Sequence, residues 1–443
     1  KVASMAKNTQ KSVRSLVIYE IYVRSHSPQG TFQGVSDDLP RIKSLGVDVV
    51  WLMPIHPIGR VRRKGSLGCP YAIADYTSVN PEYGSLADFT RLVESAHALG
   101  LKVMIDVVYN HTAHDSVILR DHPNWYHADA SGQPATTVPE WSDVIDLDFV
   151  HPDLWEYLIG ALDQWARLGV DGFRCDVASI VPLDFWLQAR AAIEKINPAC
   201  LWLAESVEAR WVAQRRAAGL PACSDSELCQ AFDITYDYDV FDAWKNVVEC
   251  KLDLQFYLDL LRLQDCIYPH NYAKLRFVEN HDQPRIISFA PERRRALAWT
   301  AFQAFNKGAW LIYAGQESAA ARQPSLFEKE PLDWGSYELS DFHYRLALIK
   351  KDPAVTAGEL IWVQHAPAVL GIWYSAAGCL AGVFNVQGNS GEMAVAIPDG
   401  SYTDRLTGRA LVVENGKLSI PEDAIIFNCA LSQVPQTGPT LLL

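Results

Sequence analysis

The sequence lacks any uninterrupted stretch of about 18 apolar residues, the length that a membrane-spanning helix needs. Basic residues are also outnumbered, because 39 Lys and Arg stand against 52 Asp and Glu, which gives a formal net charge of -13. A surface this acidic repels phosphate backbones and offers no basic anchor to an anionic membrane. We therefore expect neither nucleic acid nor a membrane as a partner.

The nine cysteines are scattered, and no C-x-x-C pair occurs among them. The spacing of a zinc site is therefore absent, and small buried thiols in a reducing compartment are the interpretation that fits. Residues 1–10 also lack the basic-then-apolar plan of a signal peptide. We expect a cytoplasmic protein, and secretion stays open if a signal peptide has been removed.

Apolar strand-like runs alternate with stretches of helical periodicity over the first 320 residues. The expected strands are 15–23, 47–52, 101–108, 170–176, 201–206, 231–236, 274–280 and 309–313. The expected helices between them include 36–45, 86–99, 154–168 and 183–196. Such alternation indicates parallel strands with crossover helices, and eight such units close a barrel.

Two segments do not follow this alternation. The passage after the third strand is too long for an ordinary connection and should form a lobe of its own. Beyond about residue 355, short alternating runs punctuated by Gly, Pro and Asn-Gly predict hairpins. We therefore predict an α/β fold, a (β/α)₈ TIM barrel with a small lobe inserted after strand 3 and a C-terminal all-β domain. The expected domains are the barrel (1–109 and 151–354), the lobe (110–150) and a β-sandwich (355–443).

Charged and imidazole side chains stand at the predicted carboxyl ends of the strands, where barrel enzymes place their reactive residues. They are Asp106 and His111 after strand three, Arg174 and Asp176 at strand four, Glu205 at strand five, and His281 and Asp282 after strand seven. Burying several like charges together is costly unless a cation compensates them. Arg174 precedes Asp176 by two residues, so it lies on the same face of its strand and is the expected cation.

Four segments then stand in the order and spacing of the α-amylase family of glycoside hydrolases. They are Asp106-Val-Val-Tyr-Asn-His111, Gly172-Phe-Arg-Cys-Asp176, Ala204-Glu205 and Phe277-Val-Glu-Asn-His-Asp282. Tyr71-Ala-Ile-Ala-Asp75-Tyr76 also resembles the segment that follows strand two in that family. The resemblance runs from about residue 18 to 320, and the β tail agrees with the family's C-terminal domain.

This resemblance implies a retaining glycosidase with three acidic residues at its centre. Asp176 matches the nucleophile, Glu205 the general acid/base, and Asp282 the carboxylate that holds ring hydroxyls. Arg174 should keep Asp176 ionised. Glu205, less compensated by charge and partly desolvated, should hold its proton longer, as an acid catalyst must.

The resemblance also implies a set of substrate-binding residues. His111 and His281 match donors to hydroxyls of the sugar in the cleaved position. Tyr71 matches the aromatic platform under that ring, and Asp106 would orient Arg174. No cofactor is required for the chemistry.

A structural calcium is compatible with the resemblance, although the metal ligands are unknown. Asn110 and Asp146 occupy positions used in calcium-binding members, whereas relatives without calcium keep similar residues. Two oxygen ligands also fall short of the six to eight that calcium takes.

The sequence departs from the family just past the proposed nucleophile. Typical endo-acting amylases carry a Lys-His pair there, and this chain has Ser179-Ile180. Recognition of the leaving-side sugars is therefore open.

The resulting hypothesis is a retaining α-glucan hydrolase that cleaves α-1,4 bonds of starch-type polysaccharides or maltooligosaccharides. An exo-acting α-glucosidase, an oligo-1,6-glucosidase or a glucosyl transferase is the alternative. A barrel that serves only as a sugar-binding subunit is more remote, because all three carboxylates are present. Trp125 and Trp141 in the lobe are candidate sugar-binding aromatics, although core packing explains most aromatic residues equally well. The oligomeric state is unknown.

Overall fold

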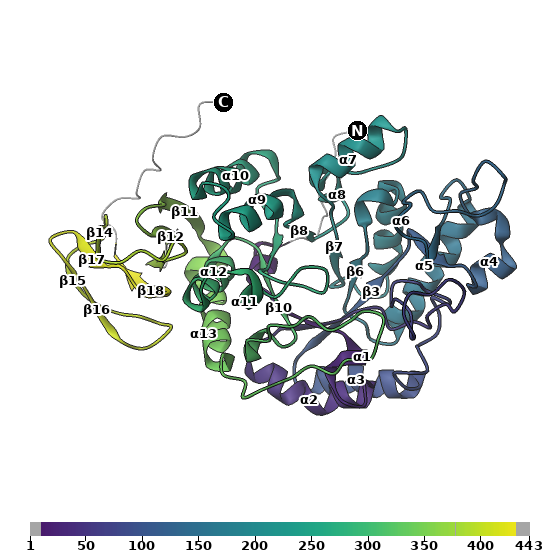
Figure 1. The fold of residues 1–443 in the computed structure, drawn as a ribbon, viewed down its shortest axis with the longest axis horizontal. Helices are drawn as coiled ribbons and strands as arrows, with labels where there is room; N and C mark the ends of the chain where they lie inside the picture. Colours follow the sequence, from purple (N-terminus) through teal and green to yellow (C-terminus); the bar gives the residue numbers. More distant parts are fainter. Residues whose placement is uncertain (1–9, 377, 431–443) are drawn as a thin grey trace. The chain divides into compact units, whose positions relative to one another are not determined.

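The computed structural model describes residues 10–376 and 378–430, and its helices and strands are labelled in Figure 1. A closed barrel has the strand order β1-β10-β9-β8-β7-β6-β3-β2. These strands are β1 (Val17–Ile21), β2 (Val49–Leu52), β3 (Lys102–Val107), β6 (Gly172–Cys175), β7 (Leu201–Ala204), β8 (Ile234–Tyr236), β9 (Lys274–Arg276) and β10 (Ala309–Tyr313). The predicted barrel is thereby confirmed. Residues 1–9 and 431–443, which enter the predictions about a signal peptide and the domain ends, lie outside the described residues.

By its internal contacts the described chain divides into two compact units. The first unit holds residues 18–236 and 324–333, and the second holds 10–17, 237–323 and 334–430. The first unit's helices are α1 (Val23–His26), α2 (Phe32–Ser44), α3 (Leu86–Ala98), α4 (Val117–Asp121), α5 (Pro152–Arg167), α6 (Leu183–Ile193), α7 (Ala209–Ala217) and α8 (Asp225–Leu228), with the 3₁₀ turns η2 (Pro123–Trp125) and η3 (Ala178–Ile180).

Local capping explains where several of these helices begin. Helix α2 starts before the predicted residue 36, because the Thr31 side chain accepts a hydrogen bond from the Gly34 N–H at 3.3 Å. Ser85 and Asp88 form a reciprocal capping box at the start of α3. Helix α5 has Pro152 at its first position, where the missing N–H costs nothing.

The insertion after β3 contains a short antiparallel hairpin of β4 (His111–Ala113) and β5 (Val144–Asp146). Its register places His111 opposite Asp146. Lys64, from the loop after β2, reaches the buried Asp143 at 2.9 Å. The predicted lobe is therefore a small hairpin-based structure, joined to the β2 loop by an ion pair.

The second unit combines barrel elements with the C-terminal strands. Its helices are α9 (Tyr238–Val248), α10 (Leu254–Ile267), α11 (Ile286–Phe289), α12 (Arg293–Phe305), α13 (Ser340–Lys350) and α14 (Pro353–Ala357), with the turns η1 (Lys11–Ser15) and η4 (Gln316–Ser318). One four-stranded sheet orders β11 (Glu359–Gln364), β12 (Val369–Ser375), β13 (Gly378–Phe384) and β18 (Ala424–Cys429). The other orders β14 (Glu392–Ala394), β17 (Lys417–Ser419), β16 (Ala410–Glu414) and β15 (Gly400–Thr403).

These two antiparallel sheets confirm the predicted all-β tail. Apolar side chains from both sheets, Ile372 and Phe427 from one and Met393 and Val413 from the other, share one buried cluster. Sheet β11-β12-β13-β18 also packs against α12. There the rings of Phe302 and Trp362 stack with centroids 4.3 Å apart.

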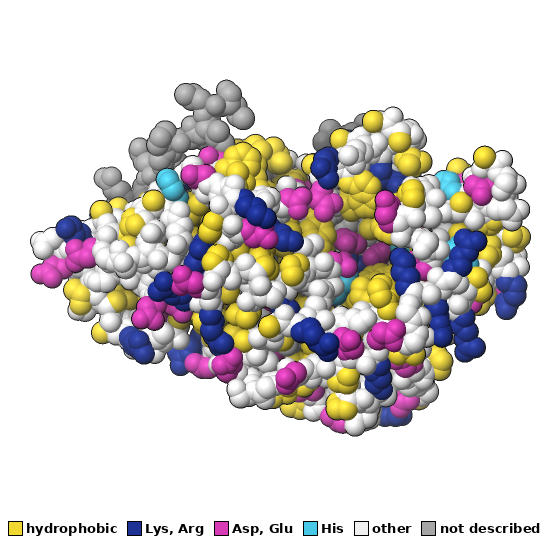
Figure 2. Space-filling view, in the orientation of Figure 1, with side chains coloured by type: hydrophobic (Ala, Val, Ile, Leu, Met, Phe, Trp, Pro, Cys, Tyr) yellow, Lys and Arg dark blue, Asp and Glu magenta, His cyan; other side chains and the backbone are white. Residues whose placement is uncertain are grey.

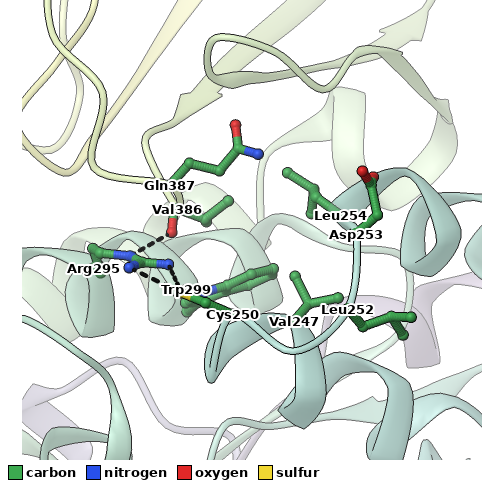
Figure 3. A pocket seen from close by; sticks show the side chains of 9 residues that line it. All are labelled: Val247, Cys250, Leu252, Asp253, Leu254, Arg295, Trp299, Val386 and Gln387. Carbon is green, nitrogen blue, oxygen red and sulfur yellow. Dashed lines mark hydrogen bonds between the residues drawn. The ribbon is translucent and has the colours of Figure 1, made fainter.

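A pocket of about 280 Å³ lies within the second unit and contains none of the predicted site residues. Arg295 donates to the carbonyl oxygen of Val386 at 2.8 Å and contacts the sulfur of Cys250, as drawn in Figure 3. On the face drawn in Figure 2, basic and acidic side chains are interspersed. Within the described chain, no helix has the length and apolar character that a membrane crossing requires.

Candidate active site

Arg174 is the centre of a buried group of charges in the first unit. It lies on β6 directly opposite Asp106 of β3 and is fully buried. One of its terminal nitrogens, Nη1, contacts Asp106 Oδ1 at 2.9 Å and Asp176 Oδ1 at 2.8 Å. The other, Nη2, lies 3.0 Å from Glu205 Oε2. One guanidinium thus contacts three carboxylates.

The pKa of Arg174 shows which effect dominates in this group. Burial by itself lowers that pKa, but the carboxylates of Asp106 and Glu205 outweigh burial and hold it well above its ordinary value. Arg174 therefore remains a cation in the interior. Its charge compensates acidic groups that could not otherwise be ionised together.

Asp176 and Glu205 follow neighbouring strands, β6 and β7, and are both nearly buried, with exposed fractions of 6% and 7%. We expected Glu205 to have less compensating positive charge nearby than Asp176, and this expectation is wrong, because Arg174 contacts both side chains. Glu205 Oε2 contacts Arg174 and also accepts the N–H of Val177 at 2.7 Å. One guanidinium therefore contacts both carboxyl groups, which follow neighbouring strands.

Val177 has an unusual backbone for a β-branched residue, with φ at 36° and ψ at 44° in the left-handed region. Such a conformation costs on the order of 1–3 kcal/mol and persists only where surrounding structure enforces it. Here it turns the chain from β6 into η3 directly after Asp176. The same turn places the Val177 N–H against Glu205.

Asp106 of β3 and Tyr71, from the loop after β2, both contact Arg174. The Tyr71 hydroxyl donates to Asp106 Oδ2 at 3.0 Å, and the ring of Tyr71 lies 5.6 Å from the Arg174 guanidinium. The structure therefore brings the sequence-predicted residues 71, 106, 174, 176 and 205 together.

Two aromatic residues at this site were missed by sequence reasoning. Arg174 Nε donates to the Tyr236 hydroxyl at 3.2 Å, and Trp51 places its ring 5.2 Å from the guanidinium. Both lie on barrel strands, β8 and β2, where an aromatic residue cannot be told from ordinary core. The position of Tyr236 at the end of its strand was the one available signal.

His111 lies in the lobe hairpin, and its ring is 5.3 Å from that of Trp141. Burial lowers the pKa of His111, although the carboxylates of Asp146 and Asp143 act in the opposite direction. The imidazole is therefore neutral near pH 7. The amide nitrogen of Asn110 lies 3.2 Å from His111 Nδ1.

Asn110 and Asp146, the pair compared with calcium ligands, are engaged with protein donors. Asp146 Oδ2 accepts the N–H of Thr137 at 2.7 Å and its hydroxyl at 2.6 Å. Asp146 Oδ1 lies 3.4 Å from the Asn110 amide nitrogen. This arrangement does not fit the six to eight oxygen ligands of calcium. No cluster of three or more His, Cys, Asp or Glu suited to a metal occurs among the residues described.

His281 and Asp282 lie in the second unit, just after β9. His281 is buried, and its Nε2 lies 3.0 Å from Asp282 Oδ2. Asn280 shapes this turn, because its side-chain oxygen accepts the N–H groups of Asp282 and Gln283, each at 2.9 Å. The two predicted residues are therefore adjacent and ordered by the same loop.

Comparison with known proteins identifies two families along the chain. The sequence profile described as "Alpha amylase, catalytic domain" matches residues 5–133 and 138–357. The profile described as "Bacterial Alpha amylase C-terminal domain" matches residues 362–427.

Individual relatives agree with these profiles. "Alpha-amylase MalA" of Haloarcula japonica is 31% identical over 366 residues, which cover 79% of this chain and 51% of the relative. The "alpha-1,4-glucan:maltose-1-phosphate maltosyltransferase" of Cereibacter sphaeroides is 32% identical over 286 residues, 59% of this chain and 45% of the relative. The chain thus spans about half the length of these curated relatives.

A solved structure resembles the chain over nearly its whole length. The crystal structure of an alpha-amylase from Lactobacillus plantarum has 43% sequence identity and a TM-score of 0.91, and the match covers 95% of this chain and 100% of that one. Because the catalytic-domain profile also covers well over half of the residues, this chain belongs to the α-amylase family.

Proposed function

We propose that this chain is a retaining α-glucan hydrolase that cleaves α-1,4-glucosidic bonds of starch-type polysaccharides or maltooligosaccharides. The observation that carries the proposal is the guanidinium of Arg174 between Asp176 and Glu205, at 2.8 and 3.0 Å. Two carboxyl groups close together, one ionised and one able to give a proton, are what retention of configuration requires.

In the first step Asp176 attacks the anomeric carbon while Glu205 protonates the departing glycosidic oxygen. The contact with Arg174 favours the ionised form of Asp176, as a nucleophile requires. Glu205 must take up a proton before this step, and protonation weakens its contact with Arg174. In the second step Glu205 removes a proton from water, which displaces Asp176 from the sugar.

The remaining predicted residues have binding roles in this proposal. Tyr71 offers its ring to the apolar face of the sugar, and Asp106 positions both Tyr71 and Arg174. His111 and His281 donate to sugar hydroxyls. Asp282 holds ring hydroxyls more strongly as positive charge develops on the sugar.

The substrate class rests on the relatives. Both the Haloarcula protein and the Lactobacillus structure are named as alpha-amylases. A second candidate, transfer of the glycosyl unit to another sugar, is favoured by the similarity to the Cereibacter maltosyltransferase. The two candidates share the first step and differ in whether water or a sugar attacks the intermediate.

The nucleophile assignment is tested by Asp176→Asn. We expect turnover of maltoheptaose to fall by a factor on the order of 10⁴ or more, because the amide cannot form the glycosyl ester. Asp184→Asn is the matched control, since Asp184 is exposed in the first turn of α6 and should keep turnover. Circular dichroism of both variants checks that they fold.

Near-normal sugar release by Asp176→Asn would disprove the assignment. Chromatography of the products separates the candidates. Early release of mixed oligomers indicates internal hydrolysis, glucose alone indicates exo action, and products longer than the substrate indicate transfer. Pullulan as a second substrate reports action on α-1,6 bonds.

We also propose that the protein works in a reducing compartment, the cytoplasm. None of the nine cysteines is joined in a disulfide, and burial raises the pKa of Cys175 well above its ordinary value, which keeps that thiol protonated. Thiol titration of protein isolated from its own cells under alkylating conditions should find nine free thiols. A disulfide in that material would contradict the proposal.

A further inference from the structure

The loop between β9 and α11 carries His281 and Asp282. The side chain of Asp282 is 42% exposed, whereas that of His281 is 1% exposed. A carboxylate this exposed is held only in part by packing, so its position depends on the backbone that carries it. A fixed backbone matters for the proposed role of Asp282, because a misplacement of about 1 Å can slow catalysis by roughly 100-fold.

A buried ion pair closes this loop. Glu279 stands at its start and Arg285 near its end, and each is 1% exposed. Arg285 Nη1 donates to Glu279 Oε1 at 2.7 Å, and Glu279 Oε2 accepts the N–H of Ile286 at 2.8 Å. Both oxygens of one carboxylate thus hold the far end of the loop, which fastens the loop across its base.

The same guanidinium joins the loop to the neighbouring barrel strand. Arg285 Nη2 donates to the carbonyl oxygen of Ala314, directly after β10, at 2.8 Å. The guanidinium also lies 4.0 Å from the centroid of the Tyr313 ring. Burial raises the pKa of Glu279, and the charge of Arg285 opposes this rise. Loss of the Glu279 charge would leave the buried cation without the carboxylate that it contacts.

A second contact reaches the loop from the chain that follows η4. Gln323 is half-buried there, and its Nε2 donates to the carbonyl oxygens of Asn280, at 3.3 Å, and of His281. The carbonyl group of His281 belongs to the peptide that leads into Asp282. The Asn280 amide nitrogen in turn donates to the Tyr238 hydroxyl of α9 at 3.0 Å. The backbone on the N-terminal side of Asp282 is therefore fixed by side chains from two other segments.

We propose that Glu279 and Gln323 are positioning residues for Asp282, and that they hold its carboxylate where it meets the sugar hydroxyls. This inference rests on the proposed function. Neither side chain needs to touch the substrate, because each acts through the backbone of the loop. Asp282 is proposed to bind more strongly as charge develops on the sugar, so its displacement weakens binding of the transition state more than binding of the substrate. The loss should therefore appear in kcat and less in KM.

The test is a double-mutant cycle with Asp282→Asn in the full chain. Initial rates on para-nitrophenyl α-maltotrioside give kcat and KM, and the good leaving group keeps slow variants measurable. We expect kcat to fall about 10- to 100-fold in Glu279→Gln and about 3- to 10-fold in Gln323→Ala, with little change in KM. When Asp282→Asn is already present, each substitution should cost less than about 2-fold more, because the carboxylate that it positions has gone.

Asp233→Asn is the matched control, because Asp233 is also a buried carboxylate with an arginine partner, Arg190, at 2.9 Å. Asp233 directly precedes β8, at the amino end of that strand. Any loss of kcat that it causes should be equal with and without Asp282→Asn. Urea unfolding of every variant reports stability separately, and a merely structural role of Glu279 would behave as this control does.

An equal fold-loss of kcat in the two backgrounds overturns the positioning role of the residue concerned and leaves the proposed hydrolysis intact. If Glu279→Gln does not fold, Gln323→Ala decides alone, because it removes only a half-buried side chain. Absence of cleavage by the unmodified protein, or full activity of Asp282→Asn, would instead overturn the proposed function.

Discussion

Arg174 shows how one side chain determines the electrostatics of a site. Three carboxylates lie within 3.0 Å of its terminal nitrogens, and three aromatic rings surround its guanidinium. Its position two residues before Asp176 was readable in the sequence, because alternate residues of a strand share a face. The contact of Arg174 with Glu205 could not be predicted from the sequence, because this contact depends on the register of β6 against β7.

His56 provides a residue-scale prediction about pH. Burial lowers its pKa to about 4, while the unfolded chain should titrate near its ordinary value of about 6.5. The unfolded state therefore binds more protons between these values. The stability contributed by neutral His56 is complete above about pH 6.5 and is lost as the pH falls toward 4.

Urea unfolding of the chain and of His56→Gln measures this effect. His56 Nδ1 lies 3.0 Å from the carbonyl oxygen of Ser78, and glutamine keeps a donor that can reach it. We expect the free energy of unfolding to fall by about 2 kcal/mol more in the unmodified chain than in His56→Gln between pH 7.5 and pH 5. Parallel curves for the two proteins would show that the pKa of His56 is the same in the folded and unfolded states.

Among the elements, the lobe hairpin is stabilised by hydrogen bonds to Asp146. Because both oxygens of Asp146 have protein partners, we expect excess EDTA to leave the melting temperature and turnover unchanged. Asp146→Ala should lower the free energy of unfolding by about 1–3 kcal/mol, since it leaves buried donors unpaired. A drop in melting temperature with EDTA that calcium restores, and magnesium does not, would establish a metal instead.

Element boundaries were predicted less well than element types, for local reasons. The predicted strand 274–280 ends at Arg276 in β9, because Asn280 hydrogen-bonds to the following backbone and turns the chain. Strand β17 has only three residues, which are too few to show alternation in the sequence. The predicted strand 309–313 coincides with β10, a continuous apolar run.

For the molecule as a whole, the second unit depends on the contact of its C-terminal sheet with α12. A Cβ atom at Gly371 would lie 2.6 Å from the Trp362 ring, which stacks on Phe302. Gly371→Ala should therefore lower the free energy of unfolding by about 1–3 kcal/mol. Thermal unfolding followed by tryptophan fluorescence measures the change.

Gly400→Ala is the control for this prediction, because its added Cβ would meet the Tyr402 ring at an ordinary 3.7 Å. It should be neutral or slightly stabilising, since alanine restricts the unfolded chain. Equal melting temperatures for Gly371→Ala and the unmodified protein would show that Trp362 moves away without cost.

The turn η1 has a consequence for how the chain is made. Its neighbour Leu16 accepts the N–H of Trp310 at 2.8 Å, and Lys11 pairs with Glu359 at 3.0 Å, 348 positions later. On a ribosome, which releases the polypeptide from its N-terminus, this segment has to wait for most of the chain before it meets either partner. The contacts of η1 in the second unit can therefore form only after Glu359 has been synthesised.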